Sequence, residues 1–164
     1  MKIAILSDLH DNYTNWGLIN KILDKEKIKI IIFCGDLCAP SMLKKMIKEF
    51  AGHIYMVYGN VADRELEKKV ADQSDKVTHF GDLGEFELEG KKIAVTHYPD
   101  KSRKLVSSGR FDLICFGHNH LKTFEKIGKT YLLNPGTSGG MFQYPSFAIF
   151  DLKKMANEFK EVVL

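Results

Sequence analysis

Short apolar runs alternate with amphipathic segments along the first part of the chain. Residues with β-branched and aromatic side chains predict strands at residues 2–7, 28–34 and 53–58. Between these strands, apolar residues recur at helical spacing and predict helices over residues 15–26 and 41–50. Alternation of this kind is typical of a parallel sheet that is covered by helices.

Several residues of these segments carry local predictions. Trp16 has apolar neighbours at helical spacing, so we expect it to face the core. Ser41 is a candidate N-cap for the helix at 41–50, and Asp63 is one for a further helix over residues 64–71. In both residues a side-chain oxygen can accept a hydrogen bond from a backbone N–H of the first helical turn.

The remainder of the chain is richer in short β-segments. Two strands, at residues 85–89 and 92–96, flank a turn at Glu89-Gly90-Lys91 and predict a hairpin. A short helix is expected near residues 100–108. Further strands are predicted at residues 112–116, 122–127, 130–133, 146–151 and 158–163. The whole pattern indicates an α/β protein with a parallel portion and antiparallel additions.

The composition is that of an ordinary globular protein. The chain has 164 residues, of which 45% are hydrophobic and 27% are charged. It contains no repeat of fixed period, no low-complexity segment and no linker rich in Pro or Gly, so we expect a single domain over residues 1–164. The net charge of +3 is too mild, and the lysines are too scattered, to indicate nucleic-acid binding.

The N-terminal run and the cysteines bear on the cellular compartment. Asp8 and His10 interrupt the apolar run, so it is neither a signal peptide nor a membrane span. The three cysteines are an odd number and predict reduced thiols in a cytoplasmic protein. Cys34 and Cys115 lie in apolar runs and are expected to be buried, whereas Cys38 lies in a loop near Asp36. A zinc site made by Cys34 and Cys38 is disfavoured, because two further ligands have no obvious source.

Residues that can bind metal ions follow one predicted strand after another. They are Asp8, His10, Asp36, Asn60, His97, His118 and His120. In open α/β sheets, ligands bind beyond the carboxyl ends of the strands, so these side chains can converge although they are far apart in the sequence. Gly-Asp and Gly-Asn alone are ordinary turn dipeptides, but their repetition at successive strand ends is not expected by chance. Asp8 and His10, like His118 and His120, would share one face if the backbone were extended.

The ligand types indicate the metal and the substrate. Mixed imidazole and carboxylate ligands suit manganese, our first choice, with nickel, zinc and iron as alternatives, better than magnesium or calcium. Two divalent ions bring four positive charges, of which Asp8, Asp36 and a bridging hydroxide would remove three. The site would stay positive and attract a phosphate ester, which a metal-activated water can hydrolyse. His53 and His79 lack a comparable context and are expected to have no part in this chemistry.

The order of these motifs resembles the calcineurin-like metallophosphoesterase superfamily. Its pattern is Asp-x-His, Gly-Asp, Gly-Asn, a lone His and Gly-His-x-His, and each element occurs here in that order over roughly residues 5–120. The compact length and the segment Asn134-Pro135-Gly136-Thr137 resemble the small bacterial and archaeal phosphodiesterase branch. The resemblance covers nearly the whole chain. It implies a four-layer α-β-β-α sandwich of two mixed β-sheets flanked by helices.

The resemblance also implies a division of the ligands between two divalent metal ions. The first ion would take Asp8, His10, Asp36 and His120. The second would take Asp36, Asn60, His97 and His118, with Asp36 bridging the two ions. It further implies hydrolysis of a small phosphate diester and, since small relatives often form dimers or larger assemblies, a homo-oligomer.

The chain departs from the family pattern where general acids are usual. Many relatives carry a His directly after Gly-Asn, where this chain has Val61, and His-Gly-His where it has His97-Tyr98-Pro99. Asp11 replaces the Gly that often follows Asp-x-His. Asp63 or a metal-bound water is therefore the candidate general acid, and Asp63 joins Asp36 and Asn60 as a predicted catalytic residue. Esters with good leaving groups need little proton transfer, so hydrolysis of activated diesters is expected.

Other functions remain as alternatives at this point. A phosphomonoesterase or nucleotide phosphatase would use the same ligands, whereas a nuclease would need a basic track that the chain lacks. A non-catalytic scaffold resembling one retromer coat subunit would have lost ligands, and here every position keeps one. A doubly wound nucleotide-binding module would need a Gly-rich loop after the first strand, and residues 7–12 supply none.

Overall fold

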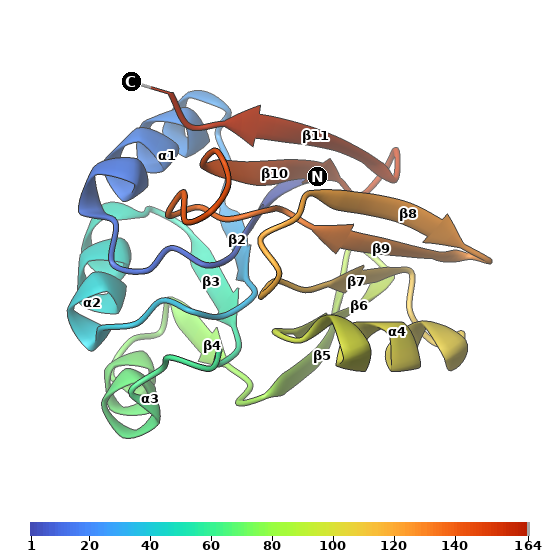
Figure 1. Cartoon of the computed structure of the whole chain (residues 1–164), viewed down its shortest axis with the longest axis horizontal. Helices are drawn as coiled ribbons and strands as arrows, with labels where there is room; N and C mark the ends of the chain where they lie inside the picture. The colour runs from blue at the N-terminus through green and yellow to red at the C-terminus, as the bar shows by residue number, and fades with distance from the viewer. Residues whose placement is uncertain (164) are drawn as a thin grey trace.

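Two β-sheets lie face to face between helices in the computed structural model, which describes residues 1–163 (Figure 1). The first sheet contains β1 (Lys2–Leu6), β2 (Ile30–Phe33), β3 (His53–Met56), β4 (Val77–His79), β10 (Ser146–Asp151) and β11 (Ala156–Glu161). The second contains β5 (Leu83–Leu88), β6 (Lys91–Thr96), β7 (Leu113–Cys115), β8 (Thr123–Ile127) and β9 (Thr130–Asn134). The helices are α1 (Tyr13–Lys25), α2 (Pro40–Glu49), α3 (Arg64–Asp72) and α4 (Pro99–Ser107).

Both sheets combine a parallel centre with antiparallel edges. The first has the order β11-β10-β1-β2-β3-β4, with β1 to β4 parallel and β10 antiparallel to β1. The second has the order β5-β6-β7-β9-β8, with β6, β7 and β9 parallel and β5 and β8 antiparallel at its edges. The predicted α/β architecture with antiparallel additions is confirmed.

Apolar side chains separate the layers. In β1, Ala4 and Leu6 pack under α1 and α2, whereas Ile3 and Ile5 pack between the two sheets. A strand that is buried on both faces needs apolar residues at every position, which is why β1 shows no alternation. On the far side of the second sheet, Leu105 of α4 packs on a third cluster. The resulting order of helices, sheet, sheet and helix confirms the predicted four-layer sandwich.

Most local predictions agree with the structure. Trp16 is fully buried, and Asp63 caps α3 by accepting a hydrogen bond from the backbone N–H of Leu66. Glu89 and Gly90 form the two-residue loop of the β5–β6 hairpin, and the positive φ of both residues fits the tight turns that match strand twist. The other predicted elements differ from the observed ones by one or two residues at their ends. Among residues 1–163, no helix combines the length and apolar composition that crossing a membrane requires.

Two details differ from the prediction. Ser41 is not an N-cap: α2 begins one residue earlier, at Pro40, whose missing N–H and fixed φ suit the first helical position. Ala39 is the N-cap, and its backbone N–H donates to Asp11 Oδ1 at 2.9 Å. The short strand β4 was not predicted, because three residues are too few to show an apolar alternation.

A buried ionisable pair joins α3 to β4. Glu67 Oε1 lies 2.9 Å from His79 Nε2, and both side chains are almost completely buried. The N–H of Gly81 donates to His79 Nδ1, so the ring proton lies on Nε2 and faces the carboxylate. Tyr58 packs on the same ring and donates its hydroxyl to the carbonyl of Arg64. The pair therefore supports the loop that follows β3.

We expect Glu67→Ala to lower the free energy of unfolding by about 2–4 kcal/mol, because it leaves a buried imidazole N–H without an acceptor. Urea unfolding followed by circular dichroism measures this, and Glu65→Ala, at an exposed position of the same helix, is the matched control. A double-mutant cycle with His79→Ala should show coupling between the two residues. Strictly additive changes would contradict the assignment.

Candidate metal centre

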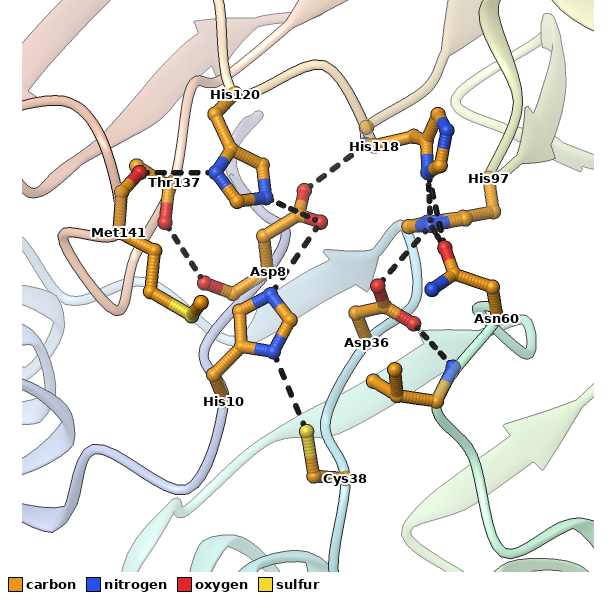
Figure 2. A network of polar contacts seen from close by, with 12 residues as sticks. Asp8, His10, Asp36, Cys38, Asn60, His97, His118, His120, Thr137 and Met141 are labelled. Carbon is orange, nitrogen blue, oxygen red and sulfur yellow. Dashed lines mark hydrogen bonds and ion pairs between the residues drawn. The ribbon is translucent and has the colours of Figure 1, made fainter.

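The predicted ligands lie together where the parallel strands of the two sheets end (Figure 2). Asp8 and His10 follow β1, Asp36 follows β2, Asn60 follows β3, His97 follows β6, and His118 and His120 follow β7. Their ligand atoms form two neighbouring groups, which are Asp8, His10 and His120 in one and Asp36, His97 and His118 in the other. Within each group the atoms lie within 4.8 Å of one another.

In the first group, the two imidazoles approach one carboxylate oxygen. Asp8 Oδ1 lies 3.2 Å from His120 Nε2 and 3.9 Å from His10 Nε2. Asp8 is fully buried. Neither Asp8 Oδ1 nor His10 Nε2 has a hydrogen-bond partner, although both atoms are buried. Two such atoms facing one another are costly unless a cation lies between them.

In the second group, Asn60 completes a cluster of four side chains. His97 Nε2 lies 3.3 Å from Asp36 Oδ2 and 3.0 Å from Asn60 Oδ1. His118 Nδ1 lies 2.9 Å from the same amide oxygen and 3.2 Å from His97 Nε2. Oxygen atoms and ring nitrogens thus converge on one small volume, which is the arrangement that a metal ion stabilises.

Backbone amides fix both carboxylates. The N–H of His118 donates to Asp8 Oδ2, and the N–H of Val61 donates to Asp36 Oδ1, each at 3.0 Å. One oxygen of each aspartate is thereby held, and the other is left to face the imidazoles. Such outer hydrogen bonds orient metal ligands before the ion arrives.

The imidazole tautomers are set in the same way. His97 Nδ1 lies 2.8 Å from the carbonyl oxygen of Cys34, and His120 Nδ1 lies 2.9 Å from that of Met141. A carbonyl can only accept, so in each neutral ring the proton lies on Nδ1 and the Nε2 lone pair faces the carboxylate. His10 Nδ1 contacts Cys38 Sγ at 3.3 Å, so Cys38 lies beside the first group.

The two histidines of Gly-His-x-His belong to different groups, as in the division of ligands that the resemblance implies. Alternation alone predicted one shared face. That prediction required an extended backbone, whereas His118 has φ 74° and His120 has φ 60°. Asp8 and His10 also have positive φ, at 53° and 46°. The left-handed backbone turns His118 toward Asp36 and His120 toward Asp8, as Figure 2 shows.

The pKa shifts favour positive charge between Asp36 and His97. Burial alone would raise the pKa of Asp36, but the adjacent His97 ring, in its protonated form, and the hydrogen bond from the Val61 N–H outweigh it and lower that pKa. Burial alone would lower the pKa of His97, but the Asp36 carboxylate outweighs it and raises that pKa. A proton or a metal ion between these two groups is therefore stabilised. The residues of both groups fit divalent metal ions.

The segment that follows β9 supports the first group through hydrogen bonds to the Asp8 backbone. Thr137 Oγ1 donates to the Asp8 carbonyl at 3.0 Å, and the Gly139 N–H donates to the same oxygen at 2.8 Å. Asn134 Nδ2 donates to the Gly117 carbonyl at 3.1 Å. The Asn-Pro-Gly-Thr element therefore supports the loops after β1 and β7, a role that its sequence alone did not reveal.

Asp63 lies apart from both groups. It is exposed, it caps α3, and it is not among the residues that line the concavity over the ligands. That concavity has a volume of about 310 Å³ and is lined by His10, Asp36, Asn60, Val61, His118, Asn119, His120, Met141 and Phe142. A catalytic role for Asp63 stays a prediction. Sequence patterns missed Met141 and Phe142, because neither residue type suggests a site and both lie more than twenty residues after His118.

Two sheets with metal-ligand residues at their strand ends are the arrangement that the resemblance to metal-dependent phosphoesterases implies. Residues 1–155 match the calcineurin-like phosphoesterase superfamily domain, so the chain belongs to this superfamily. Metal dependence is general in the family.

Individual relatives are similar over almost the whole chain. Phosphodiesterase MJ0936 of Methanocaldococcus jannaschii is 29% identical over 100% of this chain and 99% of its own length. The solved structure of an archaeal phosphodiesterase has a TM-score of 0.91 at 26% identity, covering 98% of this chain and 99% of that one. Vacuolar protein sorting 29 from Cryptosporidium parvum has a TM-score of 0.67 at 19% identity, covering 97% and 95%, and shares the fold.

We expect Gly59→Ala to weaken metal binding. A Cβ at this position would clash with the carboxylate and the backbone nitrogen of Asp36, which cannot both move. The affinity for Mn²⁺ should fall about 10- to 100-fold, as measured by calorimetry. Gly17→Ala is the matched control, because a Cβ there meets nothing within 4 Å. Unchanged Mn²⁺ affinity in Gly59→Ala would show that Asp36 is not a ligand.

Proposed function

We propose that this protein hydrolyses phosphate diesters at a centre that holds two divalent metal ions. The observation that carries the proposal is the pair of ligand groups, in which buried acceptor atoms such as Asp8 Oδ1 face imidazole lone pairs without a hydrogen-bond donor. Family membership and relatives named as phosphodiesterases support the reaction class.

The division of the ligands follows the two groups. Asp8, His10 and His120 would hold one ion, and Asn60, His97 and His118 would hold the other, with Asp36 shared between them. When bound, the two ions supply positive charge for the phosphoryl oxygens and acidify a water molecule. Manganese suits this mixture of imidazole, carboxylate and amide oxygen, with nickel, zinc or iron as alternatives.

The protein's own residues orient and shield the reacting groups. The amides of His118 and Val61 hold the two carboxylates, so little reorganisation is needed when an anionic ester enters. Asn60 offers its amide oxygen to the second group and can orient the ester through its NH₂ group. Val61, Met141 and Phe142 form apolar walls around the opening.

The lining of the concavity favours a diester over a monoester. Within the described part of the chain, its lining contains neither Lys nor Arg, which often balance the second negative charge of a phosphate monoester. Apolar walls suit instead the second organic group of a diester. A scaffold without activity is disfavoured, because every predicted ligand is present and oriented.

The unpaired cysteines support a reducing compartment, and we propose the cytoplasm. Cys34, Cys38 and Cys115 are all free, and Cys34 and Cys115 are buried in apolar surroundings.

Hydrolysis of bis-p-nitrophenyl phosphate and of p-nitrophenyl phosphate tests the proposal directly. Chelator-treated protein should be inactive, and Mn²⁺ should restore hydrolysis of the diester in preference to the monoester. Asp36→Ala should lower kcat/KM for the diester by about 100-fold or more, because it removes the shared ligand.

Asp75→Ala, at an exposed aspartate on a loop outside the ligand groups, is the matched control and should retain activity. Diester turnover that survives in Asp36→Ala, or that needs no divalent metal, would overturn the proposal. Preference for the monoester would favour the phosphomonoesterase alternative.

The general-acid role of Asp63 makes a separate prediction. Asp63→Asn keeps an N-cap for α3 but removes the proton donor. If Asp63 protonates the leaving group, the variant should lose about 10²-fold more kcat/KM with methyl phenyl phosphate than with methyl p-nitrophenyl phosphate, because phenolate is the poorer leaving group. Equal losses with the two esters would exclude Asp63 as the acid.

A further inference from the structure

Two large aromatic side chains project from the segment that follows the Asn-Pro-Gly-Thr element. Phe142 is 86% exposed and Tyr144 is 84% exposed. Scattered exposed apolar residues are normal, but full exposure of two neighbouring aromatic rings leaves most of their apolar surface in water. Neither ring packs into the core, so burial does not account for either residue.

Phe142 faces the metal centre. Its ring stacks on that of His120, with centroids 5.8 Å apart and an interplanar angle of 28°. It lines the same concavity as Asp36 and Asn60, together with Met141 and Val61. Tyr144 does not line this concavity. It borders two neighbouring hollows, one shared with Phe142 and one that also reaches His120.

The backbone that presents Phe142 is firmly held. The N–H of Ser138 donates to the Ser7 carbonyl, and the side chain of Asn12 donates to the Gly139 carbonyl, at 2.8 and 3.0 Å. The Met141 carbonyl accepts from His120, so the residue before Phe142 is tied to a predicted ligand. Phe142 itself has φ 64°, an uncommon conformation for a non-glycine residue, which the surrounding bonds must maintain.

We propose that Phe142 is a stacking platform for an aromatic group of the substrate, so that the preferred diesters carry a nucleobase or an aryl ring beside the phosphate. This inference rests on the proposed phosphodiesterase function. A volume of about 310 Å³ accommodates a phosphate and one planar ring. Because Phe142 is 86% exposed, its ring is free to stack against such a group.

Binding of phosphate esters that differ by one aromatic ring tests the platform without requiring turnover. The probes are AMP against ribose 5-phosphate, and phenyl phosphate against methyl phosphate, titrated by calorimetry into Mn²⁺-loaded protein. The aromatic member of each pair should bind about tenfold more tightly to the wild type. The first pair reports on a nucleobase and the second on an aryl ring.

Phe142→Ala should remove this preference, Phe142→Trp should retain it, and Tyr144→Ala, the equally exposed control, should leave it unchanged. A wild type without preference in either pair would overturn the platform, as would a preference that survives in Phe142→Ala. Equal weakening of all four probes, with a change in molecular mass by sedimentation, would show instead that Phe142 lies between two copies of the chain.

The two proposals fail in different ways. Metal-dependent hydrolysis of bis-p-nitrophenyl phosphate without any aromatic preference would contradict the platform alone. Aromatic preference in binding without hydrolysis of any diester would contradict the proposed reaction and leave Phe142 as a recognition residue.

Discussion

Hydrogen bonds to one buried residue, Asp8, join the loops on which the metal centre depends. Its N–H donates to the Gly35 carbonyl, its carbonyl accepts from Thr137 and Gly139, and its carboxylate accepts from the His118 N–H. These contacts connect the loops after β1, β2, β7 and β9. Because the two sheets contribute different ligands, their relative position must be fixed to a fraction of an ångström, and bonds at the shared edge achieve this.

The same edge concentrates backbone strain. Asp8, His10, Asp36, His118 and His120 all have positive φ, which costs L-residues free energy outside glycine. Gly117 relieves the crowding at one point, since a Cβ there would clash with the Ser7 side chain and crowd the Asp8 carboxylate. The strain turns ligand side chains away from the sheets and toward one another. Stability of the layers behind them, with β1 buried on both faces, allows the edge to remain strained.

Much of this arrangement could be predicted from the sequence. Runs such as residues 2–7 specify buried strands, and ligand residue types at strand ends indicate a common edge. The assignment of His118 and His120 to different groups could not be obtained from alternation, because it depends on left-handed backbone angles. The support given by Thr137 and Met141 was likewise hidden, because it uses backbone carbonyls and a hydroxyl that any loop could carry. Three-residue β4 is specified by its pairing with β3 rather than by its own pattern.

The apolar wall of the opening and the absence of a His directly after Gly-Asn are two aspects of one site. Val61 stands where many relatives have a histidine that protonates the leaving group. Its side chain makes this part of the opening apolar, and it cannot donate a proton. A site of this kind discriminates against leaving groups that depart as strong bases. Aryl esters satisfy both conditions, because their leaving groups are stabilised and their rings can stack on Phe142. For a nucleotide diester the ring would contribute binding but would not stabilise the leaving alkoxide, so turnover would depend on another proton donor. Substrate choice at this centre is therefore expected to follow the chemistry of the leaving group as closely as the shape of the ring.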